Sequence, residues 1–244
     1  MDWLEILRKF LPVNEFYQDA LQPGAKELGQ ALRDMVKTAR LLLGPISYLA
    51  AHHDRWERYL KRLSDKVPEA DMITVHPQIS GPALDGLRYV DENGLIAEMF
   101  LNLLARAMDK RRVNEAHPAF VEIIRQLSPD EALILFKLKK ARYSYTRKDR
   151  IIPRDDSHSP YTQIGELQQV IIDNEFPTSE LTFPGNFSIY VEHLAHLDLL
   201  VTRPIAHKKS DPDSPGNQVK LELRFTNFGC MFRDACVPDN LVTS

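Results

Sequence analysis

Residues 94–138 read GLIAEMFLNLLARAMDKRRVNEAHPAFVEIIRQLSPDEALILFKL, and they predict three consecutive helices. The first helix follows from apolar residues that recur at three- and four-residue steps between Leu95 and Ala107. This spacing places them on one face of an α-helix, where they can pack against a protein core. The stretch therefore favours a helical domain in the first half of the chain.

The other two helices are predicted from the residues that begin them. His117-Pro118 begins the second helix, because the N–H that proline lacks would have no partner in the first helical turn. Ser128 and Pro129 begin the third helix, in which Ser128 is the N-cap and Glu131 completes a capping box.

Upstream of this stretch, apolar residues follow a heptad pattern from Leu21 to Val67. Gly44-Pro45 interrupts the pattern, because proline removes a backbone donor and disfavours helix in the residue before it. We therefore expect two helices, over about 14–43 and 45–66. Packing within a helical domain is the favoured interpretation, and a self-associating arm or a membrane-surface helix are the alternatives. The residues that would carry self-association are Leu21, Leu28, Leu32, Met35 and Leu42.

The chain after about residue 142 has a different composition. Residues 143–186 are rich in Tyr, Ser, Pro and Asp and are expected to form an exposed, loop-rich insertion. A short amphipathic helix is predicted over 187–197, and two strands over 199–205 and 219–225. Thr226 is the predicted N-cap of a final helix.

These elements together predict a mainly α protein. A helical domain over 1–126 would be followed by a winged-helix-like domain over 127–244, which carries a β-hairpin. The order of helix, helix, hairpin and helix is the basis for the second assignment.

The bulk properties describe an ordinary globular protein of 244 residues, with 43% hydrophobic and 27% charged residues. The formal net charge of -3 argues against a protein that mainly coats nucleic acid. There is no secretory signal and no apolar run long enough to span a membrane. Cys230 and Cys236 lack the spacing of a metal or redox motif, so a reducing cytoplasm is the expected location.

Residues from about 17 to 138 resemble the abortive infection alpha (Abi-alpha) family of bacteria. The matching segments are LQPGAKELGQALRDMV, the Gly-Pro between the two early helices, PQISGPALDGLRY, LIAEMFLNLLARAMD, HPAFVEIIRQLSPDEA and, more loosely, FTNFGCMFRDAC. The resemblance implies a bacterial or prophage-encoded cytoplasmic protein in a family named for suspected involvement in phage resistance. It implies no catalytic or binding residues.

Arg112 and His117 are the candidate catalytic pair. Their spacing matches that of HEPN-type ribonucleases, in which arginine and histidine act at a phosphodiester. A chain of this composition produces the same spacing by chance, and His117 already has a structural role at a helix start. The structural interpretation is therefore favoured.

Two other groups of polar residues invite a functional interpretation. Glu98, Asn102 and Arg106 lie four residues apart, which favours an exposed ladder of charges over a buried polar patch. His193 and His196, with Glu192, have too few neighbouring ligand residues for a zinc site. No metal site and no cofactor is predicted.

A DNA-binding surface would use the hairpin of the winged-helix-like domain. Only His207, Lys208 and Lys209 are placed there to meet phosphate, and the helix over 187–197 contains no arginine or lysine. That surface is better suited to contact with protein.

The sequence therefore favours a non-enzymatic component of a bacterial antiphage or prophage-encoded system, acting through a protein partner or as a homo-oligomer. A HEPN-like ribonuclease, a winged-helix DNA-binding regulator and an effector that binds membranes through residues 21–66 are the alternatives. No small-molecule substrate is evident.

Overall fold

The computed structural model describes residues 53–152, 166–208 and 216–240. The chain divides between Arg125 and Gln126 into two compact units. Among the described residues 55% are helical and 21% are in strands, so the protein has a mixed α and β fold.

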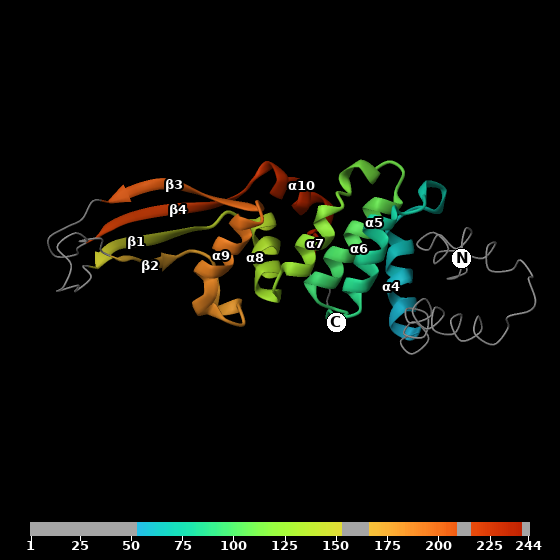
Figure 1. The fold of residues 1–244 in the computed structure, drawn as a ribbon, viewed down its shortest axis with the longest axis horizontal. Coiled ribbons are helices and arrows are strands. Elements are labelled where there is room, and N and C mark those ends of the chain that lie inside the picture. Colours follow the sequence, from blue (N-terminus) through green and yellow to red (C-terminus); the bar gives the residue numbers. More distant parts are fainter. Residues whose placement is uncertain (1–52, 153–165, 209–215, 241–244) are drawn as a thin grey trace, which may run out of the picture. The chain divides into compact units, whose positions relative to one another are not determined.

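The first unit is built from helices that lie side by side (Figure 1). Its elements are α4 (His53–Lys66), η1 (Glu69–Asp71), α5 (Pro77–Leu87), α6 (Leu95–Met108), η2 (Val113–Glu115) and α7 (Ala119–Gln126). Helix α6 is central, because α4 and α5 both pack against it and most of its residues are buried. Its fully enclosed side chains are Met99, Phe100, Leu101, Leu103, Leu104 and Met108.

The expectation of a long heptad-patterned N-terminal helical domain is wrong. The described end of the heptad pattern is α4, a helix of 14 residues. Its seam residues Trp56, Leu60 and Leu63 are buried within the first unit. The proposed self-association residues Leu21, Leu28, Leu32, Met35 and Leu42 lie outside the described residues. In the described part of the chain, no helix combines the length and the apolar character that crossing a bilayer requires.

The predicted helix starts within 94–138 are confirmed. The backbone N–H of Ala119 donates to Nδ1 of His117 over 3.1 Å, at the start of α7. At the next helix, the backbone N–H of Glu131 donates to Oγ of Ser128 over 3.3 Å, and the backbone N–H of Ser128 donates to Oε2 of Glu131 over 2.7 Å. These two bonds form the capping box that the sequence predicts.

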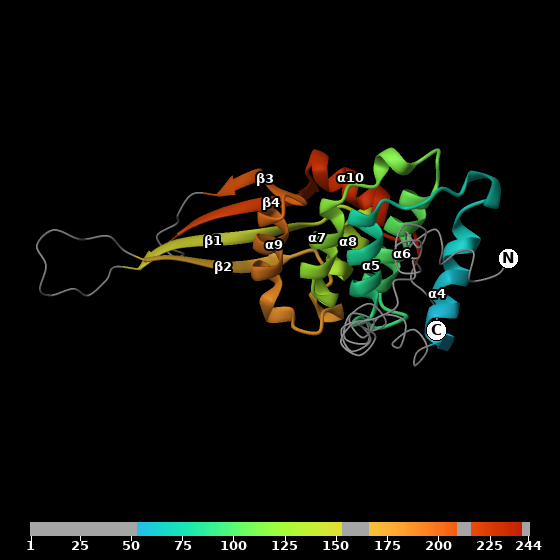
Figure 2. The same cartoon turned by 45° about the vertical axis from the view of Figure 1, so that its right-hand side comes forward.

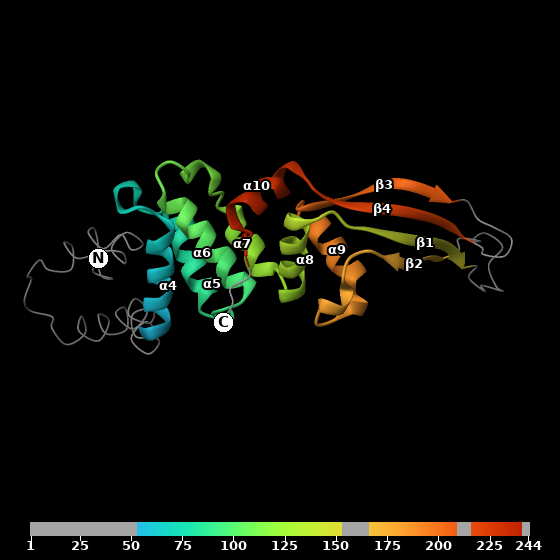
Figure 3. The same ribbon diagram turned by 180° about the vertical axis from the view of Figure 1, so that it is seen from behind.

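The second unit combines a sheet with three helices. Its elements are α8 (Pro129–Lys140), β1 (Ser144–Ile152), β2 (Glu166–Asn174), η3 (Thr178–Glu180), η4 (Pro184–Asn186), α9 (Phe187–His196), β3 (Leu200–Lys208), β4 (Asn217–Phe225) and α10 (Asn227–Cys236). The strands form one antiparallel sheet in the order β2-β1-β4-β3. Figures 2 and 3 show that the far ends of the strands extend beyond the helices of this unit.

Helix α9 packs over one end of the sheet, and the strands extend away from that end. Phe187 of α9 contacts the ring of Tyr145 of β1 edge to face, with 5.8 Å between the ring centroids. Leu194 of α9 and Leu221 and Leu223 of β4 are buried in the same unit. Among the described residues no helix lies over the remaining length of the strands, and there the sheet carries many polar side chains.

The prediction of a mainly α protein with a winged-helix-like domain and one β-hairpin is wrong, because the sheet has four strands. Residues 143–186 contain β1 and β2, where the sequence predicts a loop-rich insertion. The polar composition of 143–186 is typical of a loop but does not distinguish a loop from an exposed sheet. An antiparallel sheet that faces water carries the same composition, since only its covered end needs apolar side chains. The helix at 187–197, the two strands β3 and β4, and the N-cap Thr226 are confirmed, the last by a 2.8 Å hydrogen bond from the backbone N–H of Gly229.

Candidate functional site

The candidate ribonuclease pair lies on the surface of the first unit. Arg112 is exposed and forms an ion pair with Glu115, with 3.5 Å between Nε and Oε2. His117 is also exposed, and its Nδ1 accepts the hydrogen bond that begins α7. Both residues therefore have structural partners.

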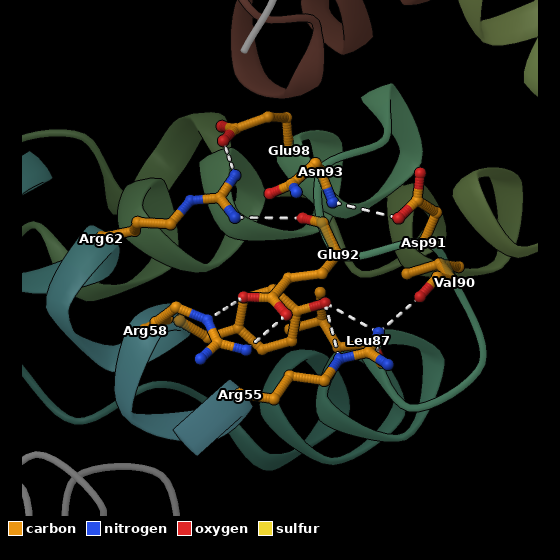
Figure 4. A network of polar contacts seen from close by, with 10 residues as sticks. Arg55, Arg58, Arg62, Leu87, Val90, Asp91, Glu92, Asn93 and Glu98 are labelled. Atoms are coloured by element: carbon orange, nitrogen blue, oxygen red, sulfur yellow. Dashed lines mark hydrogen bonds and ion pairs between the residues drawn. The ribbon is translucent and has the colours of Figure 1, made fainter. Parts of the chain in front are cut away.

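Arginines on one face of α4 form the polar network drawn in Figure 4. Arg55 donates to the hydroxyl of Tyr59 over 2.9 Å and to the carbonyls of Leu87 and Val90. One turn further on, Arg58 makes two bonds to the carboxylate of Glu92, at 2.5 and 2.8 Å. The hydrogen bond from Arg58 holds the pKa of Glu92 below its usual value. These contacts fix the segment between α5 and α6 against α4.

The same face of α4 continues into a buried ion pair. Arg62 pairs with Glu98 of α6 and donates to the carbonyl of Glu92 over 3.1 Å. Lys66 lies 3.4 Å from Glu98 and donates to the side chain of Asn102 over 2.8 Å. Glu98 is only 6% exposed, so the predicted exposed ladder is wrong at this residue. Because these cations are bonded to carboxylates and carbonyls, the network serves packing rather than anion binding.

A second polar cluster surrounds the first turn of α8. Ser128 donates to Oε2 of Glu131 over 2.8 Å, and Oε1 of Glu131 lies 2.5 Å from Nδ1 of His193. Serine, carboxylate and histidine are the residue types of a hydrolase triad, but the order is different. Here the serine is bonded to the carboxylate, whereas a nucleophilic serine needs the imidazole as its base. The cluster joins α8 to α9 and does not form a nucleophile.

The residues considered for a zinc site do not gather around a common point. His193 is bonded to Glu131, and His196 and Glu192 are exposed on α9. Within the ranges that the structure describes, no three His, Cys, Asp or Glu side chains are grouped so that they could hold a metal ion.

A groove of about 530 Å³ opens between the sheet and α9, a volume within the usual range for ligand sites. Its floor comes from β1 and β2 with Thr202 of β3, one wall from α9, and its end from η3 and η4. Three consecutive residues of β2, Gln169, Val170 and Ile171, line it. Successive strand residues point to opposite faces of a sheet, so the groove reaches around the edge of β2 as well as over one face.

Two charged side chains line the groove. Arg147 of β1 is paired with Asp149, with 2.8 Å between Nε and Oδ1, so its charge is largely compensated. Glu192 of α9 is exposed and has no cation within ion-pair distance among the described residues. Burial raises the pKa of the Tyr145 hydroxyl, so this phenol is neutral at physiological pH. The groove therefore has a negative balance of charge.

The strand beside the groove is an outer strand of the sheet. Among the described strands β2 pairs only with β1, so the backbone N–H and C=O groups on its other edge have no strand partner within the described residues. Its apolar side chains are unusually exposed: Leu167 is 57%, Val170 43% and Ile172 48% exposed. The run LQQVII is the sequence signal for this strand, and it lies within the segment predicted to be loop-rich.

The candidate nucleic-acid residues are at the opposite outer strand. His207 and Lys208 are exposed at the end of β3, and Lys209 lies outside the described residues. They are not among the residues that line the groove. Groove and basic strand end are thus separate surfaces of the same unit.

Comparison with known proteins gives one result. The family model for abortive infection alpha matches residues 51–236, which include nearly all of the described residues of both units. No curated protein and no solved structure matches the chain.

Proposed function

The chain belongs to the abortive infection alpha family, and on that premise we propose that it serves phage defence as a binding protein that acts through contacts with other proteins. The family indicates a role related to abortive infection. The contact mode is our proposal, and the groove with the adjoining edge of β2 is its proposed contact surface.

The observation that carries the proposal is the exposed apolar edge of β2 beside a groove. A long strand edge with unpaired backbone groups and apolar side chains is a template for pairing with another chain, and soluble proteins normally protect such edges. β2 has neither proline nor lysine among its nine residues. An unprotected edge next to a wall of mixed polar and apolar residues supports a binding role.

The polar clusters outside the groove favour the same conclusion. The arginines of α4 and the carboxylates at the start of α8 are engaged in bonds that hold elements of their own unit together. Their chemistry is therefore used for folding, and the groove is the surface that offers groups to a partner.

The experiment that tests this function is phage plating on bacteria that carry the protein with its neighbouring genes. The test variant is Val170→Lys, which places a charge on the exposed strand that borders the groove. The matched control is Val201→Lys, because Val201 is 47% exposed on the other outer strand, close to the 43% of Val170.

We expect the wild-type protein and V201K to reduce plating with early death of infected cells, and V170K to lose this protection. Circular dichroism would establish that both variants are folded. Equal protection by both variants would exclude the groove as the contact surface. Normal plating on a broad phage panel with the wild-type protein would contradict the defence role itself.

A further inference from the structure

We propose that the partner presents an extended peptide segment, which adds to β2 as a fifth strand of the sheet and lies in the groove between β2 and α9. This inference rests on the proposed function, because it names the kind of partner that the same surface would bind. It further specifies the side chains of the segment, which are apolar and basic.

The two outer strands of the sheet differ in their capacity to accept another strand. β3 contains Pro204, and its register with β4 shifts between Pro204 and Ala206. Proline and irregular register are both devices that prevent edge pairing. The register of β2 with β1 also shifts once, between Thr146 and Arg147, but it is regular from Arg147 to Ile152, along most of β2, and β2 contains no proline. The edge of β2 is therefore the one suited to strand addition.

The groove supplies the second requirement for peptide recognition. In strand addition, main-chain hydrogen bonds give affinity and pockets for alternate side chains give specificity. Val191 and Glu192 of α9 face the groove from the wall opposite β2, and Ser188 lies one turn earlier. A peptide on the edge of β2 would thus direct alternate side chains toward apolar and polar groups of α9.

The charged side chains of β2 and of the groove indicate which charge the peptide segment would carry. β2 carries the carboxylate of Asp173 and no lysine or arginine. Glu192 adds a carboxylate without a partner among the described residues, and Arg147 is already paired with Asp149. A basic side chain in the peptide would be attracted by this balance, whereas an acidic one would be repelled.

A second copy of this chain fits the edge less well than a basic segment does. Its own β2 carries Asp173 and no lysine or arginine, so it lacks the basic side chain that the charge beside the groove would attract. The charge pattern therefore favours a different chain as the partner.

The test uses a synthetic acetylated peptide of alternating valine and threonine with a central lysine, of the same nine-residue length as β2. Binding to the full-length protein would be measured by fluorescence anisotropy, up to a peptide concentration of about 1 mM. Hydrogen exchange, measured in parallel, reports on the amides of β2. We expect binding, with protection of alternate β2 amides, those that do not bond to β1.

Two peptide controls separate strand addition from other modes. N-methylation of one set of alternate peptide residues should abolish binding, and N-methylation of the other set should leave it unchanged, because only one set donates to β2. Replacing the lysine by glutamate should weaken binding by about three- to tenfold. The variant Glu192→Lys should reverse the preference between the two peptides.

The outcomes distinguish the inference from the proposed function. No binding of the lysine peptide, or binding that is insensitive to N-methylation, overturns strand addition. Dimers in sedimentation experiments that V170K abolishes and V201K retains would identify a second copy as the occupant. Peptide binding without any effect of V170K on phage plating would keep this inference and overturn the proposed function. Loss of plating protection in V170K, with no binding of the peptide to the wild-type protein, would keep the proposed function and overturn this inference.

Discussion

The carboxylate of Glu98 on α6 forms a buried ion pair with the guanidinium of Arg62 on α4. The side chain of Glu98 is 7% exposed and that of Arg62 23%. The two residues are distant in sequence, and their pairing ties α4 to the central helix of the first unit. Burial lowers the pKa of Arg62, which reflects the unfavourable desolvation that the pair must offset.

We predict that Glu98→Ala destabilises the first unit by about 3 kcal/mol, because the partly buried guanidinium of Arg62 loses its buried counter-charge. Urea unfolding followed by circular dichroism would measure the change. Asp85→Asn is the control in the same unit. It removes partly exposed pairs with Arg88 and Arg125, whose nitrogens lie 3.3 and 3.7 Å away, and should change the stability by less than about 1 kcal/mol. Equal effects of the two variants would contradict the importance of burial at Glu98.

The sequence pattern predicts an exposed Glu98, whereas the structure buries it. A local pattern of this kind therefore does not predict burial. The steps of four from Glu98 to Asn102 and Arg106 fit an exposed ladder and a buried patch equally well. The structure decides between them through Arg62 and Lys66, which come from another helix. By contrast, the capping box of Ser128 and Glu131 depends on residues three apart, so the sequence was sufficient to predict it.

The same distinction explains the sheet and the groove. Leu221 and Leu223 alternate with polar residues in β4, and this period of two predicts a strand locally. β1 has no such apolar alternation, since charged residues occupy its middle and Arg147 pairs with Asp149 two residues on. Its strand character depends on pairing with β2 and β4. The groove could not be predicted for the same reason, since it needs β2 to lie opposite α9.

Two glycines of α5 should respond oppositely to alanine. A Cβ atom on Gly86 would lie 2.5 Å from the ring of Phe100, which is enclosed in the core, whereas a Cβ on Gly81 would have no atom within 4 Å. Gly86→Ala should therefore destabilise the protein by about 1–3 kcal/mol. Gly81→Ala should stabilise it by about 0.5–1 kcal/mol, because alanine loses less backbone entropy in a helix.

Thermal unfolding of the two variants beside the wild-type protein would measure both changes. A Gly86→Ala protein as stable as the wild type would show that α5 and α6 are not in the close contact described here. The double variant Gly86→Ala, Phe100→Leu tests the cause directly. The smaller side chain should make the alanine less harmful than it is beside Phe100.

The carboxylate of Asp130 should make the second unit sensitive to acid. Burial raises the pKa of Asp130. Hydrogen bonds from the backbone of Thr182 and Phe183, at 2.8 and 3.0 Å, and from the hydroxyl of Tyr190 together lower the pKa by more than burial raises it. The net pKa in the folded protein lies below the ordinary value of 3.8. Because the folded pKa is the lower one, the ionised group stabilises the fold above the unfolded pKa, and this contribution is lost as the pH falls through the folded pKa.

We therefore expect the free energy of unfolding to fall between about pH 5 and pH 2, with Asp130 as one contributor. Asp130→Asn should be less stable than the wild type near pH 7, since a neutral amide accepts these bonds more weakly than a carboxylate does. The difference between the two proteins should shrink as the pH falls, because the wild-type carboxylate becomes protonated. Urea unfolding at several pH values would measure it. A difference that is constant down to pH 2 would show that Asp130 is not the titrating group.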